Sequence, residues 1–578
     1  MSEAEASGVF EIGLAMAGAI SGGAYTAGVV DFLIQALDEW EKAKTTNPGD
    51  DTIPKHTTRL RVLSGASAGG MTAAVLAASL HEGFLPVTGL ATGQPAPPNN
   101  KLYDCWVNRI DISHFLGVLD LGPGKKVVSL LDSTVLDGIA DYAFGPARRQ
   151  TTGINRPYVD EHLDIFLTIA NLRGVPYTVG FKGGSTSGHE QVQHQDSVRF
   201  VLGTTPPAEP LGEALFLNAA ARRGPHWDIF RKAALATGAF PVGLAPQVMT
   251  LPMAPYGKRT WDIPREVECP EPGKKKVKFD VVPITPDWEG LGVAPEPEWD
   301  FMAVDGGLMN NEPFELARKA LAGGDCSNPR TLDEVRRAVL MVDPFPEAEW
   351  DWKATRQTYL EADIVQAAKW MFSALKAQAR FKPEEIALAL NENTYSRFLL
   401  TPSAGDAGGN WPAMAAASLG GFGGFLSRKF RNYDFQLGRR NCQRFLQDHF
   451  VLPLGTQHNI QAVQKNPVFG NYKYLNKSPY TDSKGLPVLP IIPLCGGLKT
   501  TEEQMIPRQD ILMEAADIAS LEAPIQRRIK ALAATYAAGM DQGFARWLIR
   551  RVVNWKAPGM ARDLAAYIRK ALQANGLA

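Results

Sequence analysis

Cysteine is scarce in this chain and shows no pairing pattern. The 578 residues include five cysteines, which lie far apart and form no C-x-x-C motif: Cys105, Cys269, Cys326, Cys442 and Cys495. An odd number of dispersed cysteines argues against a disulfide framework. We therefore interpret them as reduced, mostly structural thiols in a reducing compartment.

Histidine is sparse, and the charge is nearly balanced. The nine histidines form no H-x-x-x-H or H-E-x-x-H pattern, and the formal net charge is -1. Histidine-based metal sites and strongly basic nucleic-acid surfaces are therefore not indicated. We predict no metal, no cofactor and no nucleic-acid partner.

The N-terminus lacks the features of a targeting segment. Met1 to Phe10 is acidic and has no basic region, and the apolar run that follows is short and interrupted by Gly13 and Gly18. This pattern predicts neither a signal peptide nor a transmembrane helix. The expected location is the cytoplasm or the periphery of a membrane.

Strand and helix patterns alternate along the first half of the chain. Apolar periodicity indicates helices over Ala24–Trp40 and Met71–Leu80. This alternation predicts an α/β fold with a mainly parallel sheet, in which residues that follow the strands cluster at one edge. The expected strands are Phe10–Ala17, Leu60–Leu63, His162–Asn171, Ala303–Asp305 and Ala338–Val342.

The length exceeds that of one ordinary domain, so we expect two packed regions or one large domain with insertions. We divide the chain into a domain over residues 9–345 and a mostly helical region over residues 346–578. The first has insertions at about 90–130 and 250–300. The second insertion is rich in proline and contains the basic run Lys274–Lys278, which favours a solvated loop or an excursion on the sheet.

Helical patterns dominate the C-terminal region. Tyr359–Asn391 and Asp510–Leu577 are rich in alanine, leucine and arginine, which is typical of helices. Asp434–Asn441, between these two segments, receives no chemical assignment.

A glycine-rich apolar segment, Ala415–Phe425, also lies in this region and is expected to be mobile. Exposure of Leu419, Phe422 and Phe425 would make it a lid or a lipid-docking surface. Burial at a helix junction is the alternative, and the sequence leaves both open.

Ser67 is the centre of a G-x-S-x-G motif formed with Gly65 and Gly69. An apolar strand precedes the motif and a helix of small residues follows it. A serine on such a strand-to-helix turn has its hydroxyl exposed at a helix N-terminus, which suits nucleophilic attack on a carbonyl. The alternative is an ordinary structural turn.

A second turn lies between the first expected strand and the first expected helix. Its residues are Gly18, Ala19, Ile20, Ser21, Gly22 and Gly23. Backbone N–H groups at such a position can stabilise an oxyanion. A phosphate-binding loop is less favoured, because the G-x-G-x-x-G spacing and the G-K-[ST] ending are absent. A plain tight turn is the remaining alternative.

Asp305 ends an apolar strand and is followed by Gly306 and Gly307. A carboxylate held at a strand end with two glycines beside it has room to accept a proton from a serine. The alternative is a turn aspartate that caps the helix beginning near Pro313.

Three blocks together resemble the patatin-like phospholipase family, of the bacterial type and with a long C-terminal extension. The glycine loop at 18–23, the motif at 65–69 and the Asp305-Gly306-Gly307 block occur in the family's order, and Ala236–Pro241 resembles the segment that precedes the catalytic aspartate there. The resemblance covers about residues 9–345. It implies a three-layer sandwich around a mainly parallel sheet.

The resemblance implies a Ser67–Asp305 dyad without histidine. Ser67 would attack an ester carbonyl, and Asp305 would act as general base and then as acid. The oxyanion hole would be formed by the backbone of residues 18–23. The expected activity is that of a serine lipid acyl hydrolase of the phospholipase A, lysophospholipase or lipase type, in transient contact with a membrane.

The loop departs from the family pattern of three glycines followed, two positions on, by a basic residue. Here those positions hold Gly18, Ala19, Ile20 and Gly22. Backbone donors do not require glycine, so an oxyanion hole remains compatible with this sequence. The sequence leaves open how the loop is anchored and whether Ile20 narrows the site.

Two other functions remain open at this point. A histidine-dependent esterase would place His449 or His458 in a triad, since both follow Asp305 in the chain. A catalytically weak membrane-interaction protein that retains the fold is the other. Headgroup, acyl position, chain length and oligomeric state are not encoded in these patterns.

Overall fold

The computed structural model describes residues 8–90, 93–97, 99–145, 154–179, 189–268, 275–283, 285–289, 297–323, 328–346, 355–363, 367, 370–371, 374, 377–380, 394–405, 411–540 and 543–578. Most of the expected segment Tyr359–Asn391 lies outside the described residues. Of the expected structural thiols, Cys105, Cys442 and Cys495 are buried and unpaired, and Cys269 and Cys326 lie outside the described residues.

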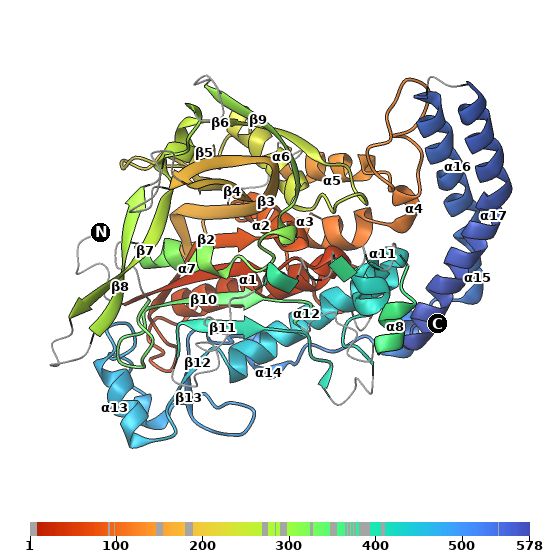
Figure 1. The fold of residues 1–578 in the computed structure, drawn as a ribbon. Helices are drawn as coiled ribbons and strands as arrows, with labels where there is room; N and C mark the ends of the chain where they lie inside the picture. Colours follow the sequence, from red (N-terminus) through yellow and green to blue (C-terminus); the bar gives the residue numbers. More distant parts are fainter. Residues whose placement is uncertain are drawn as a thin grey trace.

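A nine-stranded sheet forms the centre of the molecule (Figure 1). Its main path runs β11–β10–β1–β2–β3–β4–β5, while β9 pairs with β3 and β6 pairs with β9. The strands are β1 (Val9–Met16), β2 (Thr57–Gly65), β3 (Val159–Val179), β4 (His189–Gly203), β5 (Leu215–Asn218), β6 (Gln247–Pro252), β9 (Glu298–Asp305), β10 (Arg337–Val342) and β11 (Arg397–Leu400).

The neighbours from β11 to β3 are all parallel, which confirms the predicted α/β class with a mostly parallel sheet. The strands β4, β6 and β9 introduce antiparallel pairs. The five strands expected from the sequence correspond to β1, β2, β3, β9 and β10.

Helices cover both faces of the sheet. Along β1, Phe10, Ile12, Leu14 and Met16 point into the larger core, whereas Ala15 points into a smaller cluster on the other face. This alternation follows from the two-residue period of a strand. The helices nearest the sheet are α1 (Gly23–Thr46), α2 (Ser67–Ser79), α6 (Pro225–Thr237), α7 (Phe314–Ala322) and α12 (Arg428–Asp448).

Helix α1 is apolar and long enough to span a bilayer, but 89% of the qualifying window, within Ile20–Thr46, is buried inside the protein. It packs against α12 with the two backbones in contact. A Cβ atom added at Gly28 would lie 1.9 Å from the carbonyl oxygen of Phe435, and one added at Gly438 would lie 2.1 Å from that of Tyr25. Glycine at both positions therefore permits the close crossing.

The C-terminal region contributes to the same sheet and core. The predicted boundary at residue 345 falls between β10 and β11, which are hydrogen-bonded neighbours. Its remaining helices and strands are α8 (Arg356–Leu360), η9 (Ala415–Gly421), α11 (Gly423–Leu426), β12 (Val451–Pro453), α13 (Gln457–Lys465), η10 (Leu475–Lys477), β13 (Val488–Pro490), α14 (Gly497–Thr500), η11 (Arg508–Ile511), α15 (Ala515–Ser520), α16 (Glu522–Ala538) and α17 (Gly543–Ala574). In Figure 1, α16 and α17 form a hairpin at the side of the molecule.

The two predicted insertions contain regular structure. In the second, β7 (Thr260–Glu268) and β8 (Lys275–Pro283) form a separate antiparallel pair, so this part is an excursion and not a plain loop. The basic run Lys274–Lys278 lies mostly on β8. The remaining short helices, in and around the insertions and in the turns beside β1 and β9, are η1 (Ile20–Gly22), α3 (Lys101–Tyr103), η3 (Asp104–Arg109), α4 (Ile112–Phe115), α5 (Thr134–Phe144), η4 (Ala254–Lys258) and η6 (Gly306–Leu308).

Candidate active site

Ser67 lies on a sharp turn between β2 and α2. The backbone is extended at Ala66, with φ of -121°, and enters the left-handed region at Ser67, with φ of 51°. A non-glycine residue in that region is strained, and the sharp turn from strand to helix presents its side chain clear of the backbone. The flanking residues must be glycine, because a Cβ at Gly65 would lie 2.6 Å from Gly70 and one at Gly69 would lie 2.2 Å from the carbonyl oxygen of Met16.

Asp305 lies at the end of β9, directly opposite Ser67. Its Oδ2 accepts a hydrogen bond of 2.6 Å from Ser67 Oγ, and its Oδ1 accepts one of 2.7 Å from the N–H of Gly307. The two side chains are 6% and 5% exposed, so water screens their interaction weakly. Gly306 lies against β3, where a Cβ would be 2.2 Å from the carbonyl oxygen of Thr168.

The two strands that carry the dyad meet end to end along β3. The last residue of β2, Gly65, pairs with Leu167 in a parallel register, and Asp305 pairs with Ile169 in an antiparallel one. The strand ends therefore approach each other from opposite directions, two positions apart on β3. The sequence predicted convergence at one edge of a parallel sheet, and the antiparallel approach of β9 corrects that detail.

The segment Ala236–Pro241 holds both members of the dyad. Thr237 Oγ1 accepts the N–H of Ser67 at 2.9 Å, and the carbonyl oxygen of Ala239 accepts the N–H of Asp305, also at 2.9 Å. The sequence marked this segment by its small residues but gave no role to Thr237. Its role depends on a contact across 170 residues, which no local pattern reveals.

The glycine loop at residues 18–23 passes beside Ser67. A Cβ atom at Gly18 would lie 3.1 Å from Ser67 Cβ and 2.3 Å from Asn311 Oδ1. The carbonyl oxygen of Asn311 accepts the N–H of Gly18 at 3.0 Å, so this buried asparagine connects the loop to the segment after Asp305. Asn311 lies outside the three motifs, and no sequence pattern assigned it a role.

Only some of the backbone N–H groups of residues 18–23 are available as oxyanion donors. The N–H groups of Gly18 and Gly22 are donated to the carbonyl oxygens of Asn311 and Ala19, so neither is free for an oxyanion in this conformation. Among the described residues, the N–H groups of Ala19 and Ile20 have no hydrogen-bond acceptor. Ala68 adds a third N–H from the first turn of α2, where intrahelical acceptors are missing.

The loop is anchored by the glycine-rich segment Ala415–Phe425. Ser21 Oγ donates to the carbonyl oxygen of Gly421 and accepts the N–H of Gly424 at 3.0 Å. Ile20 packs beside Gly421, and Gly22 faces the side chains of Met414 and Phe345. These contacts hold the loop in place, although it lacks the basic residue of the patatin-like pattern that it resembles.

The glycine-rich segment Ala415–Phe425 is mostly buried and does not form an exposed lid. Phe425 is 6% exposed, and Leu419 and Phe422 are partly buried against the core. The ring of Phe422 packs edge-on against that of Phe240, next to the segment that holds Asp305. Of the two readings left open by the sequence, the structure has the buried junction.

Asp434 fixes the start of the anchoring segment. Its carboxylate oxygens accept the N–H groups of Ala415 at 2.7 Å and Ala416 at 2.8 Å. Burial raises the pKa of Asp434 to about 7, although these two N–H groups lower it in part.

The segment Asp434–Asn441, which had no chemical assignment, has a structural role on α12. The guanidinium of Arg439 pairs with Asp31 of α1 and, at 2.7 Å, with Glu503. Arg439 and Asp31 are both fully buried. Asn441 bonds the backbone of Ser403. These polar residues are therefore paired interior groups and do not form a second site.

The two histidines proposed for a triad lie near the N-terminal ends of β1 and β10, far from the C-terminal end of β2 that Ser67 follows. His449 precedes Phe450, whose ring packs against Phe10 at the start of β1. His458 lies near Asp333, before the start of β10. Ser67 follows the end of β2, about 20 Å away along the strands. Within the described part of the chain, no group of three His, Cys, Asp or Glu side chains is arranged to hold a metal.

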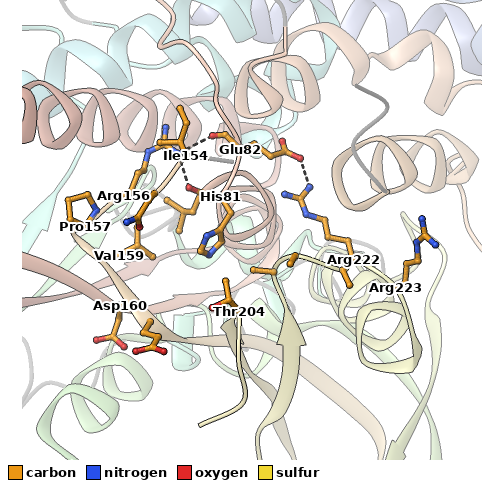
Figure 2. A pocket seen from close by; sticks show the side chains of 16 residues that line it. His81, Glu82, Ile154, Arg156, Pro157, Val159, Asp160, Thr204, Arg222 and Arg223 are labelled. Carbon is orange, nitrogen blue, oxygen red and sulfur yellow. Dashed lines mark hydrogen bonds and ion pairs between the residues drawn. The ribbon is translucent and has the colours of Figure 1, made fainter. Parts of the chain in front are cut away.

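A cleft of about 900 Å³ also lies far from the dyad, beside the start of β3 (Figure 2). It is lined by Leu80, His81 and Glu82 after α2 and by Arg156 before β3. Arg222 pairs with Glu82, and the backbone carbonyls of Leu80 and Glu82 accept bonds from Arg156. Leu80 and Ser67 are at opposite ends of α2, about 20 Å apart, so this cleft is separate from the dyad.

No model of a known protein family matches the chain. The chain is similar to the uncharacterized protein y4iI of Sinorhizobium fredii, with 36% identity over 531 residues. The match covers 84% of this chain and 71% of y4iI. It therefore extends well beyond the three motifs, and the chain belongs to the same protein family as y4iI.

Proposed function

We propose that this protein is a serine lipid acyl hydrolase with a patatin-like fold, which cleaves carboxylic ester bonds through the Ser67–Asp305 dyad. The observation that carries the proposal is the direct 2.6 Å hydrogen bond between Ser67 Oγ and Asp305 Oδ2, with Ser67 at φ of 51°. In this arrangement, the hydroxyl that would act as nucleophile is hydrogen-bonded directly to the buried carboxylate that would act as general base.

Acylation would begin with attack of Ser67 Oγ on the ester carbonyl carbon while Asp305 takes the hydroxyl proton. The tetrahedral oxyanion would accept hydrogen bonds from the N–H groups of Ala19, Ile20 and Ala68. Each such donor contributes about 2.7–4 kcal/mol to the transition state. As the intermediate collapses, the carbon–oxygen bond to the alcohol breaks, and Asp305 gives its proton to the departing oxygen.

Deacylation would use the same groups in reverse. Asp305 takes a proton from water, the hydroxide oxygen attacks the acyl carbon, and the bond to Ser67 Oγ breaks. The proton on Asp305 then returns to Ser67. The products are one carboxylic acid and one alcohol, and the cycle requires no cofactor.

Lipid substrates are proposed because of the resemblance of the three blocks and the apolar surroundings of the dyad. Phe240, Phe345 and Met414 lie close to the loop and to the segments that hold Ser67 and Asp305. Such surroundings favour an acyl chain over a polar substrate. Transient contact with a membrane belongs to this proposal.

The test is mass spectrometry of lipid products after incubation of purified protein with mixed phospholipids. Wild type should release fatty acid and a lysolipid or glycerol product, and Ser67→Ala should release neither above background. Ser79→Ala, which removes a buried hydroxyl at the other end of α2, serves as the matched control and should remain active. Lipid hydrolysis by folded Ser67→Ala would refute the proposal.

A further inference from the structure

The C-terminal hairpin exposes large apolar side chains beside basic ones. On α17, Trp555 is 78% exposed, and Trp547, Leu548 and Val552 are between 42% and 51% exposed. The exposed basic residues Arg546, Arg551 and Lys556 are their neighbours in sequence. We call these seven residues the basic–aromatic face of α17.

Charge is concentrated on this helix. Residues 543–570 contain seven arginines and lysines and a single acidic residue, Asp563, although the whole chain has a formal net charge of -1. A helix with tryptophan and aliphatic residues beside arginine and lysine is typical of segments that lie in the interface of an anionic bilayer. The basic residues are attracted to anionic headgroups, and the apolar ones enter the acyl boundary.

A second exposed apolar group lies between the hairpin and the dyad. Leu119, Val128, Leu130 and Val242 are between 53% and 75% exposed, and Phe240 is 38% exposed. We call these five residues the apolar rim. The N–H of Leu130 donates to the carbonyl oxygen of Val242 at 2.8 Å, which ties the two parts of the rim together. The exposed Lys125 and Lys126 lie in the same loop.

Hydrogen bonds connect the hairpin to this rim. Arg528 of α16 is buried and donates to the carbonyl oxygens of Leu130 at 2.9 Å and Gly117 at 2.8 Å. Thr535, farther along α16, accepts the N–H of Gly122 at 3.2 Å. In Figure 1, the orange loop between α4 and α5 accordingly reaches the hairpin. The rim in turn adjoins Ala239, which accepts the N–H of Asp305.

From this arrangement, we propose that the basic–aromatic face of α17 and the apolar rim form a docking surface for an anionic lipid bilayer. This proposal rests on the proposed function, because the docking surface would bring the dyad to its lipid substrate. Trp547 and Trp555 offer stacking surfaces for bases, but the aliphatic Leu548 and Val552 beside them and the aliphatic residues of the rim do not, so a nucleic acid fits less well. Tryptophan and arginine are also common at protein interfaces, but lysine is depleted there, so the exposed Lys125, Lys126 and Lys556 favour a bilayer over a protein partner.

The test is co-sedimentation of the full chain with vesicles of phosphatidylcholine, with or without phosphatidylglycerol. We expect binding to the anionic vesicles that weakens with added salt. Arg551→Glu with Lys556→Glu should weaken it by at least about twentyfold, since each basic residue near an anionic surface contributes about fivefold. Trp555→Ser with Val552→Ser should also weaken binding strongly.

The matched control is Lys484→Glu with Leu486→Ser. These residues form an exposed basic–apolar pair in the turn before β13, away from the hairpin, and Leu486 is 54% exposed. The control should bind as wild type does. Equal binding by the α17 variants and wild type, or no binding to anionic vesicles, would overturn the proposal. So would loss of single-stranded DNA binding or self-association in these variants with vesicle binding unchanged.

Catalysis is measured separately, so that the two proposals can fail independently. The α17 variants should hydrolyse a water-soluble short-chain ester at the wild-type rate, because none of these residues touches the dyad. Ser67→Ala should bind anionic vesicles as wild type does. If wild type binds anionic vesicles but hydrolyses no ester, only the proposed function is rejected. If wild type hydrolyses the ester but does not bind the vesicles, only the docking surface is rejected.

Discussion

The glycine loop at residues 18–23 and the segment at Ala415–Phe425 are both glycine-rich, yet the sequence describes them very differently. The first follows a buried strand and precedes a long helix, so its place beside Ser67 could be predicted. The second resembles a mobile surface segment by composition, but it is packed and hydrogen-bonded against the first, 400 residues away. The local sequence pattern places the glycine loop beside Ser67, and long-range contacts hold that loop in place.

The comparison implies that the chemistry and its support can be separated by mutation. Substitutions in the dyad should abolish catalysis and leave the fold stable. Substitutions in α12 or at the loop contact should lower stability first and activity second. The following variants test this division, from the largest expected effect on stability to the smallest.

Arg439→Ala should lower the free energy of unfolding by about 3–5 kcal/mol, because it leaves Asp31 buried without its cation. Both residues are fully buried where α1 crosses α12. Arg444→Ala on the same helix is the control, since its pair with Glu502 is exposed and contributes at most about 1 kcal/mol. Chemical denaturation of both variants gives the measurement, and equal losses would contradict the assigned role of Arg439.

Asp434→Asn should change how stability depends on pH. The pKa of Asp434 rises from its ordinary 3.8 to about 7 in the folded protein, because burial penalises the charged carboxylate. The folded state therefore holds a proton that the unfolded state releases across this window, and wild type loses stability as pH rises through it. The loss relative to the Asp434→Asn variant should reach about 1.4 kcal/mol per pH unit where it is steepest.

Denaturation of wild type and Asp434→Asn at a series of pH values makes this measurement, because other titrating groups cancel in the difference. The difference should level off above about pH 7, where Asp434 is ionised in both states. A difference that stays constant between pH 4 and 7 would show that Asp434 does not titrate there.

Ser21→Ala should cost about 1–3 kcal/mol of stability, because it leaves the buried carbonyl of Gly421 and the N–H of Gly424 without a partner. Its kcat on a soluble ester should fall roughly tenfold, since the donors of Ala19 and Ile20 depend on the position of this loop. Ser79→Ala removes another buried hydroxyl and should leave kcat unchanged. Wild-type kcat in Ser21→Ala would mean that the anchor does not position the loop.

Much of the sheet could be predicted because its strands are short apolar runs between turns. The strands around Phe10–Ala17, Leu60–Leu63 and Ala338–Val342 lie where the pattern placed them, and Ser67 follows the second. The antiparallel direction of β9 could not be predicted, because it depends on β3 continuing past the end of β2 to offer Ile169 as a partner. Strand direction is a property of the whole topology.

The residues that position the dyad were harder to predict from the sequence than the dyad itself. Thr237 and Asn311 act through single hydrogen bonds to Ser67 and Gly18, and neither residue type is unusual in its local sequence. Asp434 and Arg439 received no chemical assignment from the sequence. Asp434 binds backbone N–H groups of Ala415 and Ala416, which no side-chain pattern reveals, and Arg439 pairs with Asp31, 408 residues away. The strand, the strained turn and the helix of a G-x-S-x-G motif, by contrast, all lie within one short segment, so a local pattern is enough to identify them.

The most direct test of the account is the rate at which a fluorophosphonate labels Ser67, read by peptide mass spectrometry. Labelling should be rapid in wild type and about 10²–10⁴-fold slower in Asp305→Asn, the range that general base catalysis contributes. Asp300→Asn, an exposed position on the same strand, and the double variant His449→Gln with His458→Gln should both label at the wild-type rate. Wild-type labelling in Asp305→Asn, or loss of labelling in the histidine variant, would contradict a Ser67–Asp305 dyad.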